Sequence, residues 1–228
     1  GELVLCYDNK GNWRREYFPN YKHGRRKDRK ASTLDWGSIF DTLHLIKTEL
    51  QDNFPYKVLE VENAEADDII ASVVRYVAES PSHYEKVLIV SGDKDFIQLQ
   101  KHNFVTQYSP VLKKFVNGID PEVYIKEHVL KGDRSDGVPN FLSPDNTFVD
   151  EMRQRPISKK KLATWVDLEP EDFCNEEMLR NYQRNRTLID LEYAPTEIHD
   201  ACVDTYLNST VNDRSGLLNY FIKHRLKN

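Results

Sequence analysis

The segment from Val87 to Phe96 constrains the fold more than any other stretch of this sequence. Its first four residues, Val87 to Val90, are all apolar and predict a short buried strand. Asp93 and Asp95 follow directly, ahead of a helix-like segment over 96–100. Ligands of open α/β sheets bind beyond the carboxyl ends of the strands, so two acids at this place favour a ligand site. The structural alternative is a helix N-cap by Asp93 with Asp95 in the first turn.

The rest of the pattern predicts an α/β domain over 1–131 followed by a helical region over 132–228. Apolar runs of strand length alternate with three- and four-residue spacings in the first part, and strand signals fade from Phe141 onward. The expected elements are strands at 3–7, 56–61, 87–90 and 104–107, a hairpin arm at 113–116, and helices at 34–54, 64–78, 120–130, 148–154, 158–166, 175–191, 195–207 and 213–225. This order predicts a three-layer fold around a parallel-type sheet.

The net charge of −5 hides a strongly basic segment at 13–31, which carries +6 and leaves −11 for the remainder. Pro19 and Gly24 interrupt helical patterns there, and the apolar surface is too small to join the core. Basic side chains interleaved with aromatic ones suit single-stranded nucleic acid, and a solvated basic loop is the alternative. The candidate contacts are Arg14, Arg15, Tyr21, Lys22, Arg25, Arg26, Lys27, Arg29 and Lys30. Lys159, Lys160 and Lys161 at a later helix start could also meet a phosphate, and a solvated helix end is the alternative for them.

Composition excludes several other classes of protein. The sequence is 39% hydrophobic and 30% charged, with no apolar run of membrane-spanning length and no signal-type start. Cys6, Cys174 and Cys202 are odd in number and widely separated. They predict a reducing cytoplasm.

Acids fall at the predicted strand ends, helix starts and loops of the first domain. In a three-layer domain these positions converge on one rim of the sheet, where so many carboxylates need counter-charge. Mg²⁺ suits such oxygen ligands, and two ions could clamp an in-line phosphoryl displacement. Neither a His/Cys cluster for zinc nor a Walker A loop is present. The acids are Asp8, Glu65, Asp67, Asp68, Asp93, Asp95, Asp133 and Asp136. Beside a basic segment they indicate metal-dependent cleavage of nucleic acid, although helix-start and turn preferences are the structural alternative for several of them.

Five short motifs occur in an order that resembles a known superfamily. They are YDN at 7–9, NYK at 20–22, EADD at 65–68, SGDKDF at 91–96 and GDRSDGVPN at 132–140. Together they resemble the 5′-nuclease superfamily of flap endonucleases and polymerase-associated 5′–3′ exonucleases, and within it especially the ribonucleases H of T-even-type bacteriophages. The resemblance implies a Mg²⁺-dependent nuclease, with Mn²⁺ as a substitute ion, that removes RNA primers and 5′ flaps during phage-type DNA replication. If the protein is viral, the expected location is the cytoplasm of the host cell.

The resemblance also implies a role for each matching residue. Segment 13–31 matches a flexible arch for single-stranded 5′ ends, with Lys22 near the scissile phosphate, and 132–166 matches a helix–two-turn–helix element that holds duplex. Asp133 is expected to order its loop. The implied direct or close metal ligands are Asp8, Glu65, Asp67, Asp93 and Asp95, with Asp68 and Asp136 acting through water.

The implied partners are DNA with 5′ flaps or nicks, RNA–DNA hybrid, and a single-strand-binding protein or sliding clamp, with the chain itself a monomer and no membrane involved. Two departures leave alternatives open. The superfamily has an earlier strand that ends in a metal-binding Asp, and no such strand is present before Gly1 in this sequence. The superfamily also has a glycine-rich hairpin in the helix–two-turn–helix region, where this sequence has PNFLSPDNTF. The alternatives are an impaired fragment that binds branched DNA and a PIN-like ribonuclease acting on single strands.

Overall fold

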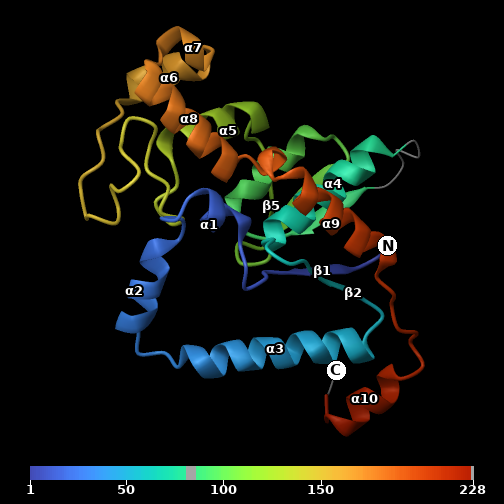
Figure 1. Cartoon of the computed structure of the whole chain (residues 1–228). Coiled ribbons are helices and arrows are strands. Elements are labelled where there is room, and N and C mark those ends of the chain that lie inside the picture. The colour runs from blue at the N-terminus through green and yellow to red at the C-terminus, as the bar shows by residue number, and fades with distance from the viewer. Residues whose placement is uncertain (81–85, 227–228) are drawn as a thin grey trace.

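The computed structural model describes residues 1–80 and 86–226, except for the side chain of Arg26. Its strands form two small sheets (Figure 1). Strand β1 (Val4–Tyr7) pairs in parallel with β2 (Lys57–Glu60). In the other sheet, β3 (Val87–Val90) pairs in parallel with β4 (Val105–Ser109), and β5 (Lys114–Val116) runs antiparallel to β4. These strands confirm the predicted ones to within a few residues at each end.

Most of the predicted helices are also confirmed. The helices are α1 (Trp13–Tyr17), α2 (His23–Ala31), α3 (Trp36–Asn53), α4 (Ala66–Glu79), the 3-10 helix η1 (Lys94–Lys101), α5 (Pro121–Lys131), α6 (Lys159–Val166), α7 (Pro170–Phe173), α8 (Glu176–Ile189), the 3-10 helix η2 (Leu191–Tyr193), α9 (Thr196–Asn208) and α10 (Leu217–Lys223). Asp120 caps α5 with Pro121 at its first position, as its sequence indicated. None of the described helices is long and apolar enough to cross a membrane.

The helix predicted at 148–154 is wrong, because this segment forms turns and irregular backbone. Side chains from the preceding loop form hydrogen bonds with backbone N–H and C=O groups at the end of this segment, where a helix would use those groups for its own hydrogen bonds. The Asn140 amide donates to the Arg155 carbonyl, and the Arg155 N–H donates to the Ser143 hydroxyl. Pro156 also disfavours helical backbone at the residue before it.

The basic segment differs from the flexible, unpacked stretch that the sequence suggested. Its first half packs into the protein, since Trp13, Phe18 and Tyr21 are buried. Phe18 and Tyr21 join a core cluster with apolar residues of α5, α6 and α8. Pro19 separates α1 from α2, whereas Gly24 lies within the first turn of α2 and does not interrupt it. The second half, α2, is an exposed basic helix that leads to α3 (Figure 1).

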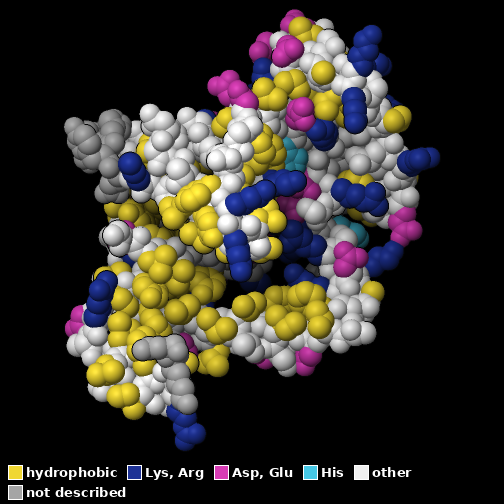
Figure 2. Space-filling model, turned by 180° about the vertical axis from the view of Figure 1, so that it is seen from behind, with side chains coloured by type: hydrophobic (Ala, Val, Ile, Leu, Met, Phe, Trp, Pro, Cys, Tyr) yellow, Lys and Arg dark blue, Asp and Glu magenta, His cyan; other side chains and the backbone are white. Residues whose placement is uncertain are grey.

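Two apolar segments remain open to solvent where the sequence predicted burial. In β3 only Ile89 is buried, and Leu88 and Val90 are 54% and 60% exposed. Helix α3 has the predicted amphipathic spacing but buries no residue completely. Figure 2 shows hydrophobic side chains gathered along α3 and around a hollow between this helix and the rest of the protein. Burial of a strand or helix depends on what covers it. The continuous apolar run at 87–90 and the helical spacing at 34–54 did not reveal that these faces are open.

Candidate metal centre

One pocket collects the carboxylates of the first domain. It has a volume of about 990 Å³, and seven of the eight predicted acids line it, together with Lys22 and Arg25. The seven are Asp8, Glu65, Asp67, Asp93, Asp95, Asp133 and Asp136. They come from the end of β1, the start of α4, the loop after β3, η1 and the loop after α5. The predicted gathering is confirmed for these seven acids. The expected single sheet is wrong, because the strands before Asp8 and Asp93 belong to two separate small sheets.

Asp8 and α4 form one side of the pocket. The Ala66 N–H donates to Oδ1 of Asp8 over 2.8 Å, which fixes the carboxyl end of β1 against the first turn of α4. Asp67 lies in that turn, and burial, with the nearby charges of Asp93, Glu65 and Asp95, raises its pKa to about 7. A raised pKa of this kind marks a carboxylate that lacks counter-charge.

Asp95 and Asp133 lie on opposite sides of His128, which comes from α5. Nδ1 of His128 is 3.3 Å from Oδ1 of Asp95, and Nε2 is 3.4 Å from Oδ2 of Asp133. Burial alone would lower the pKa of His128, but the two carboxylates outweigh it and raise the pKa to about 9. One ligand atom from each of the three lies within 4.8 Å of the others, a spacing that fits a shared divalent ion.

Asp133 also orders its own loop, as predicted. Its Oδ1 accepts hydrogen bonds from the hydroxyl and the N–H of Ser135. Burial opposes ionisation, but these hydrogen bonds and His128 hold the pKa of Asp133 well below its usual range. The ionised carboxylate therefore both shapes the turn and faces His128.

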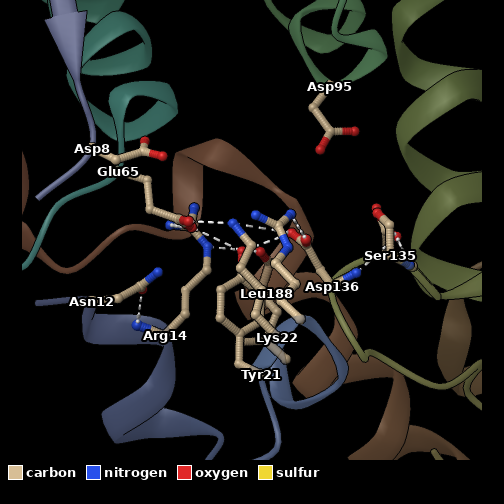
Figure 3. Close-up of polar contacts among 12 residues, drawn as sticks. Asp8, Asn12, Arg14, Tyr21, Lys22, Glu65, Asp95, Ser135, Asp136 and Leu188 are labelled. Atoms are coloured by element: carbon tan, nitrogen blue, oxygen red, sulfur yellow. Dashed lines mark hydrogen bonds and ion pairs between the residues drawn. The ribbon is translucent and has the colours of Figure 1, made fainter. Parts of the chain in front are cut away.

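A polar network joins the basic segment to the acids (Figure 3). The Tyr21 hydroxyl lies 2.8 Å from Glu65 and 2.8 Å from Asp136. Lys22 forms ion pairs with the same two carboxylates, and Arg25 donates to Asp136 over 2.7 Å. Burial would raise the pKa of Glu65, but Lys22 and Arg14 lower it. The pKa of Asp136 is raised, because burial outweighs its cationic neighbours.

Asp68 and Arg14 do not reach this pocket. The Asp68 side chain is fully buried, where it accepts from the N–H of Glu65 and completes a capping box at the start of α4. The Arg14 side chain is 2% exposed, and its guanidinium is bound to Asp68 and to the Leu188 carbonyl. Both residues hold the fold together, and neither is accessible to a phosphate in this structure. The sequence expectations for these two are corrected on this ground.

The remaining basic candidates lie on exposed helices. Arg15, Lys27, Arg29 and Lys30 are exposed, and Lys27 pairs with Glu151 of the loop before α6. Arg29 lies over the rings of Trp36 and Phe40, while the side chain of Arg26 lies outside the described part of the structure. Lys159, Lys160 and Lys161 are exposed in the first turn of α6, outside the pocket.

His128 and Tyr124 are two pocket residues beside the acids that sequence reasoning missed. They lie one helical turn apart on α5, and the Tyr124 hydroxyl donates to Oδ1 of Asp95 over 3.3 Å. Their spacing of four residues puts both on one face of the helix. The sequence feature that could have identified them is the pair of polar side chains at 124 and 128, just before the GDRSD loop. This feature is weak evidence, because an aromatic residue and a histidine four residues apart are common in ordinary amphipathic helices.

Comparison with known families identifies the class to which this fold and pocket belong. The family model described as the N-terminal resolvase-like domain of 5′–3′ exonucleases matches residues 1–131, and the model of the T4 RNase H C-terminal region matches residues 119–228. This chain therefore belongs to the 5′–3′ exonuclease and flap endonuclease superfamily, as its motifs suggested.

Individual relatives give the extent of the similarity. The chain is 33% identical to Ribonuclease H of Enterobacteria phage T4 over 231 residues, which cover 97% of this chain and 75% of that protein. It is also 33% identical to DNA polymerase I of Lactococcus lactis subsp. cremoris over 151 residues, 60% of this chain and 16% of the polymerase.

Solved structures share the fold at lower sequence identity. The T5 D15 protein co-crystallised with metal ions is 19% identical and aligns with a TM-score of 0.57 over 90% of this chain and 85% of that chain. A pseudo-enzyme–product complex of the bacteriophage T5 D15 flap endonuclease with DNA and metal ions aligns with a TM-score of 0.55 over 99% and 83% of the two chains. These structures support an α/β fold with small sheets and a helical C-terminal region.

Proposed function

We propose that this chain is a divalent-metal-dependent 5′–3′ exonuclease and flap endonuclease with ribonuclease H activity. The observation that carries the proposal is the meeting of seven acids from distant parts of the chain beside Lys22 and Arg25. Oxygen-rich pockets of this kind suit Mg²⁺ or Mn²⁺, and the T4 and T5 relatives supply the reaction class. The substrates we propose are 5′ flaps, nicks and RNA–DNA hybrid, with RNA primer removal in phage-type replication as the biological role.

The residues that would hold two Mg²⁺ ions are the acids around the pocket. Asp8, Asp67 and Asp93 would hold one ion, and Asp95 and Asp136 the other, with Glu65 close to both. When bound, such ions make water a stronger nucleophile and stabilise the leaving oxygen of a phosphodiester. Asp67, with its pKa raised to about 7, binds an ion only after it loses its proton.

Lys22 is the residue of this chain that we assign to the developing negative charge. Its ammonium group lies at the pocket wall between Glu65 and Asp136, so its charge faces the space in which a phosphate would lie. A positioned cation in a partly buried site stabilises a transition state by more than the same cation in water. Arg25, which also lines the pocket, would bind a phosphate as well.

The nucleic acid would lie across the exposed basic helices. Arg15, Lys27, Arg29 and Lys30 would track a single-stranded 5′ end along the arch, and Lys159 to Lys161 would bind duplex phosphates. This proposal keeps the division into a metal-binding domain of three-layer type over 1–131 and a duplex-binding region over 132–228. Structure and charge, and no base sequence, would select the substrate.

The test is the double substitution Asp93→Asn with Asp95→Asn. With a labelled 5′-flap duplex and Mg²⁺, we expect the wild-type chain to release 5′-phosphate-ended product and the double variant to bind the flap without cutting it. Asp200→Asn, an exposed acid of α9 outside the pocket, is the matched control and should cut normally. Unchanged turnover in the double variant would rule out the metal centre. Binding without product by the wild type would identify a branched-DNA-binding module instead.

A further inference from the structure

We propose that His128 is a nitrogen ligand of a divalent ion in this pocket, with Asp95 as an oxygen ligand and Asp133 as the carboxylate that orients the imidazole. The inference deepens the proposed function, on which it rests, because it assigns a donor other than oxygen to one of the two ion positions. Metal-binding imidazoles commonly donate their other ring N–H to a carboxylate, an arrangement that fixes ring orientation and tautomer. His128 and the carboxylates on its two sides show this order.

The first observation is the environment of the two ring nitrogens. Nε2 lies 3.4 Å from Oδ2 of Asp133, and that carboxylate is held in place by two hydrogen bonds from Ser135. Nδ1 lies 3.3 Å from Oδ1 of Asp95, yet it is buried and makes no hydrogen bond. An ion that binds Nδ1 displaces the proton of this nitrogen to solvent. In the tautomer that remains, with its proton on Nε2, the N–H donates to Asp133 and the lone pair of Nδ1 faces Asp95.

The second observation is the rigidity of the two ligands. His128 lies on α5, a regular helix of 11 residues capped by Asp120. Asp95 is held by the Tyr124 hydroxyl from the same helix, one turn earlier. A buried polar atom without a hydrogen-bond partner destabilises the folded protein. A divalent ion between Nδ1 and Asp95 would satisfy this nitrogen without moving the helix, because the ligand atoms already lie within 4.8 Å of one another.

The choice of ion follows from the donor set. Sites built only from carboxylate and water oxygens suit Mg²⁺, whereas imidazole nitrogen favours transition ions such as Mn²⁺ and Co²⁺. We therefore expect one ion position, at Asp95 and His128, to prefer Mn²⁺ over Mg²⁺ more strongly than the position at Asp8, Asp67 and Asp93.

The experiment reads the ligand directly, without measuring activity. Mn²⁺ is bound to the full chain, and pulsed electron paramagnetic resonance detects ¹⁴N modulation from a coordinated imidazole. The chain has seven histidines, so a sample grown with ¹⁵N-histidine first shows whether any of them binds the ion. We expect ¹⁴N modulation in the wild type that changes to the ¹⁵N pattern after labelling. This part needs no substitution and is independent of how a variant folds.

Two variants then assign the nitrogen. His128→Gln should lose the imidazole modulation and lower the Mn²⁺/Mg²⁺ affinity ratio by about tenfold or more. His102→Gln changes a histidine that packs near Phe104 outside the pocket, and it should keep both properties. Bound Mn²⁺ without ¹⁴N modulation, or modulation that persists in His128→Gln, overturns the inference about His128 and leaves the proposed function standing. Failure of the wild type to bind Mn²⁺ overturns both.

Discussion

The guanidinium of Arg14 and the carboxylate of Asp68 form an ion pair that solvent does not reach. Nη2 and Oδ1 are 2.8 Å apart, and the two side chains are 2% and 0% exposed. Nε of Arg14 donates to the Leu188 carbonyl, and Asp68 accepts from the indole N–H of Trp13. The pair thus connects α1 and α4 to the C-terminal turn of α8. Through Glu65, which lies 3.3 Å from the same guanidinium, it also supports the wall of the pocket.

Substitution of Arg14 should therefore lower the stability of the folded protein. Arg14→Ala leaves Asp68 charged and buried without its partner, and we expect a loss of about 3–5 kcal/mol in the free energy of unfolding. The neighbouring Arg15→Ala, at an exposed position of α1, should change that free energy by less than about 0.5 kcal/mol. Urea unfolding of both variants measures the difference. Equal effects would show that the buried pair does not stabilise the fold.

Lys22 should act on cleavage and much less on binding. In Lys22→Ala the positive charge at the pocket wall is removed, and we expect the single-turnover cleavage rate of a flap substrate to fall about 10²–10³-fold. Binding, which depends on many phosphates, should weaken by far less. Lys223→Ala, on exposed α10 and outside the proposed nucleic-acid contacts, is the control and should retain the cleavage rate. If the two variants cut equally fast, Lys22 has no part in the chemistry.

The gathering of the acids could be predicted from sequence because it depends on local rules. A short apolar run predicts a strand, parallel strands end at one edge of a sheet, and acids after such ends meet. Asp8 and Asp93 line the pocket as expected, although β1 and β3 before them belong to two separate small sheets, and Asp133 enters the pocket through its turn. Each inference needed only a few neighbouring residues. For this reason the position of the candidate metal centre followed from the amino-acid sequence alone.

The errors concern partners that lie far away along the chain. Arg14 was expected at phosphates because it belongs to a basic run, but its acceptors are Asp68 and Leu188, more than 50 residues away. His128 was missed because its role depends on Asp95, which lies on η1. Composition and periodicity describe a segment and do not reveal the surface against which it folds. Charge runs are therefore a guide to a region, and assignment of single residues in them needs tertiary contacts.

The salt dependence of DNA binding should distinguish the contribution of α2 from that of α6. When a substitution removes one phosphate-binding cation, the slope of log affinity against log salt decreases by about 0.7 for a single strand and about 0.9 for duplex. Lys30→Ala on α2 should lower the slope for flap DNA but leave simple duplex unaffected, and Lys160→Ala on α6 should lower it for both. Fluorescence anisotropy at several salt concentrations gives these slopes. Lys223→Ala on α10 is the control, and a change of slope there would contradict the assignment.

The stability of the ion-free protein should depend on Asp67. Burial, with the charges of Asp93, Glu65 and Asp95, raises its pKa from 3.8 to about 7. Since the folded protein binds this proton more tightly than the unfolded chain does, the contribution is complete below about pH 4 and is lost as the pH rises through about 7. Asp67→Asn lacks this dependence. Its midpoint of thermal unfolding, measured with chelator present, should exceed that of the wild type at pH 8 and match it at pH 4.

The proton on Asp67 should also affect ion binding. Protonation of Asp67 stabilises the ion-free fold but weakens the affinity for a divalent ion. A divalent ion binds ionised Asp67, so below pH 7 each ion that enters this position displaces one proton. The part of the apparent Mn²⁺ affinity that depends on Asp67, measured by calorimetry, should therefore fall about tenfold for each pH unit below 7 and level off above it. The proton that the ion displaces from His128 adds a separate slope that continues up to about pH 9. Repeating the titration in buffers of different ionisation enthalpy counts the protons released. In Asp67→Asn affinity is lower throughout, and the slope assigned to this group disappears. An affinity that stays constant between pH 5.5 and 7 in the wild type would mean that Asp67 does not bind the ion.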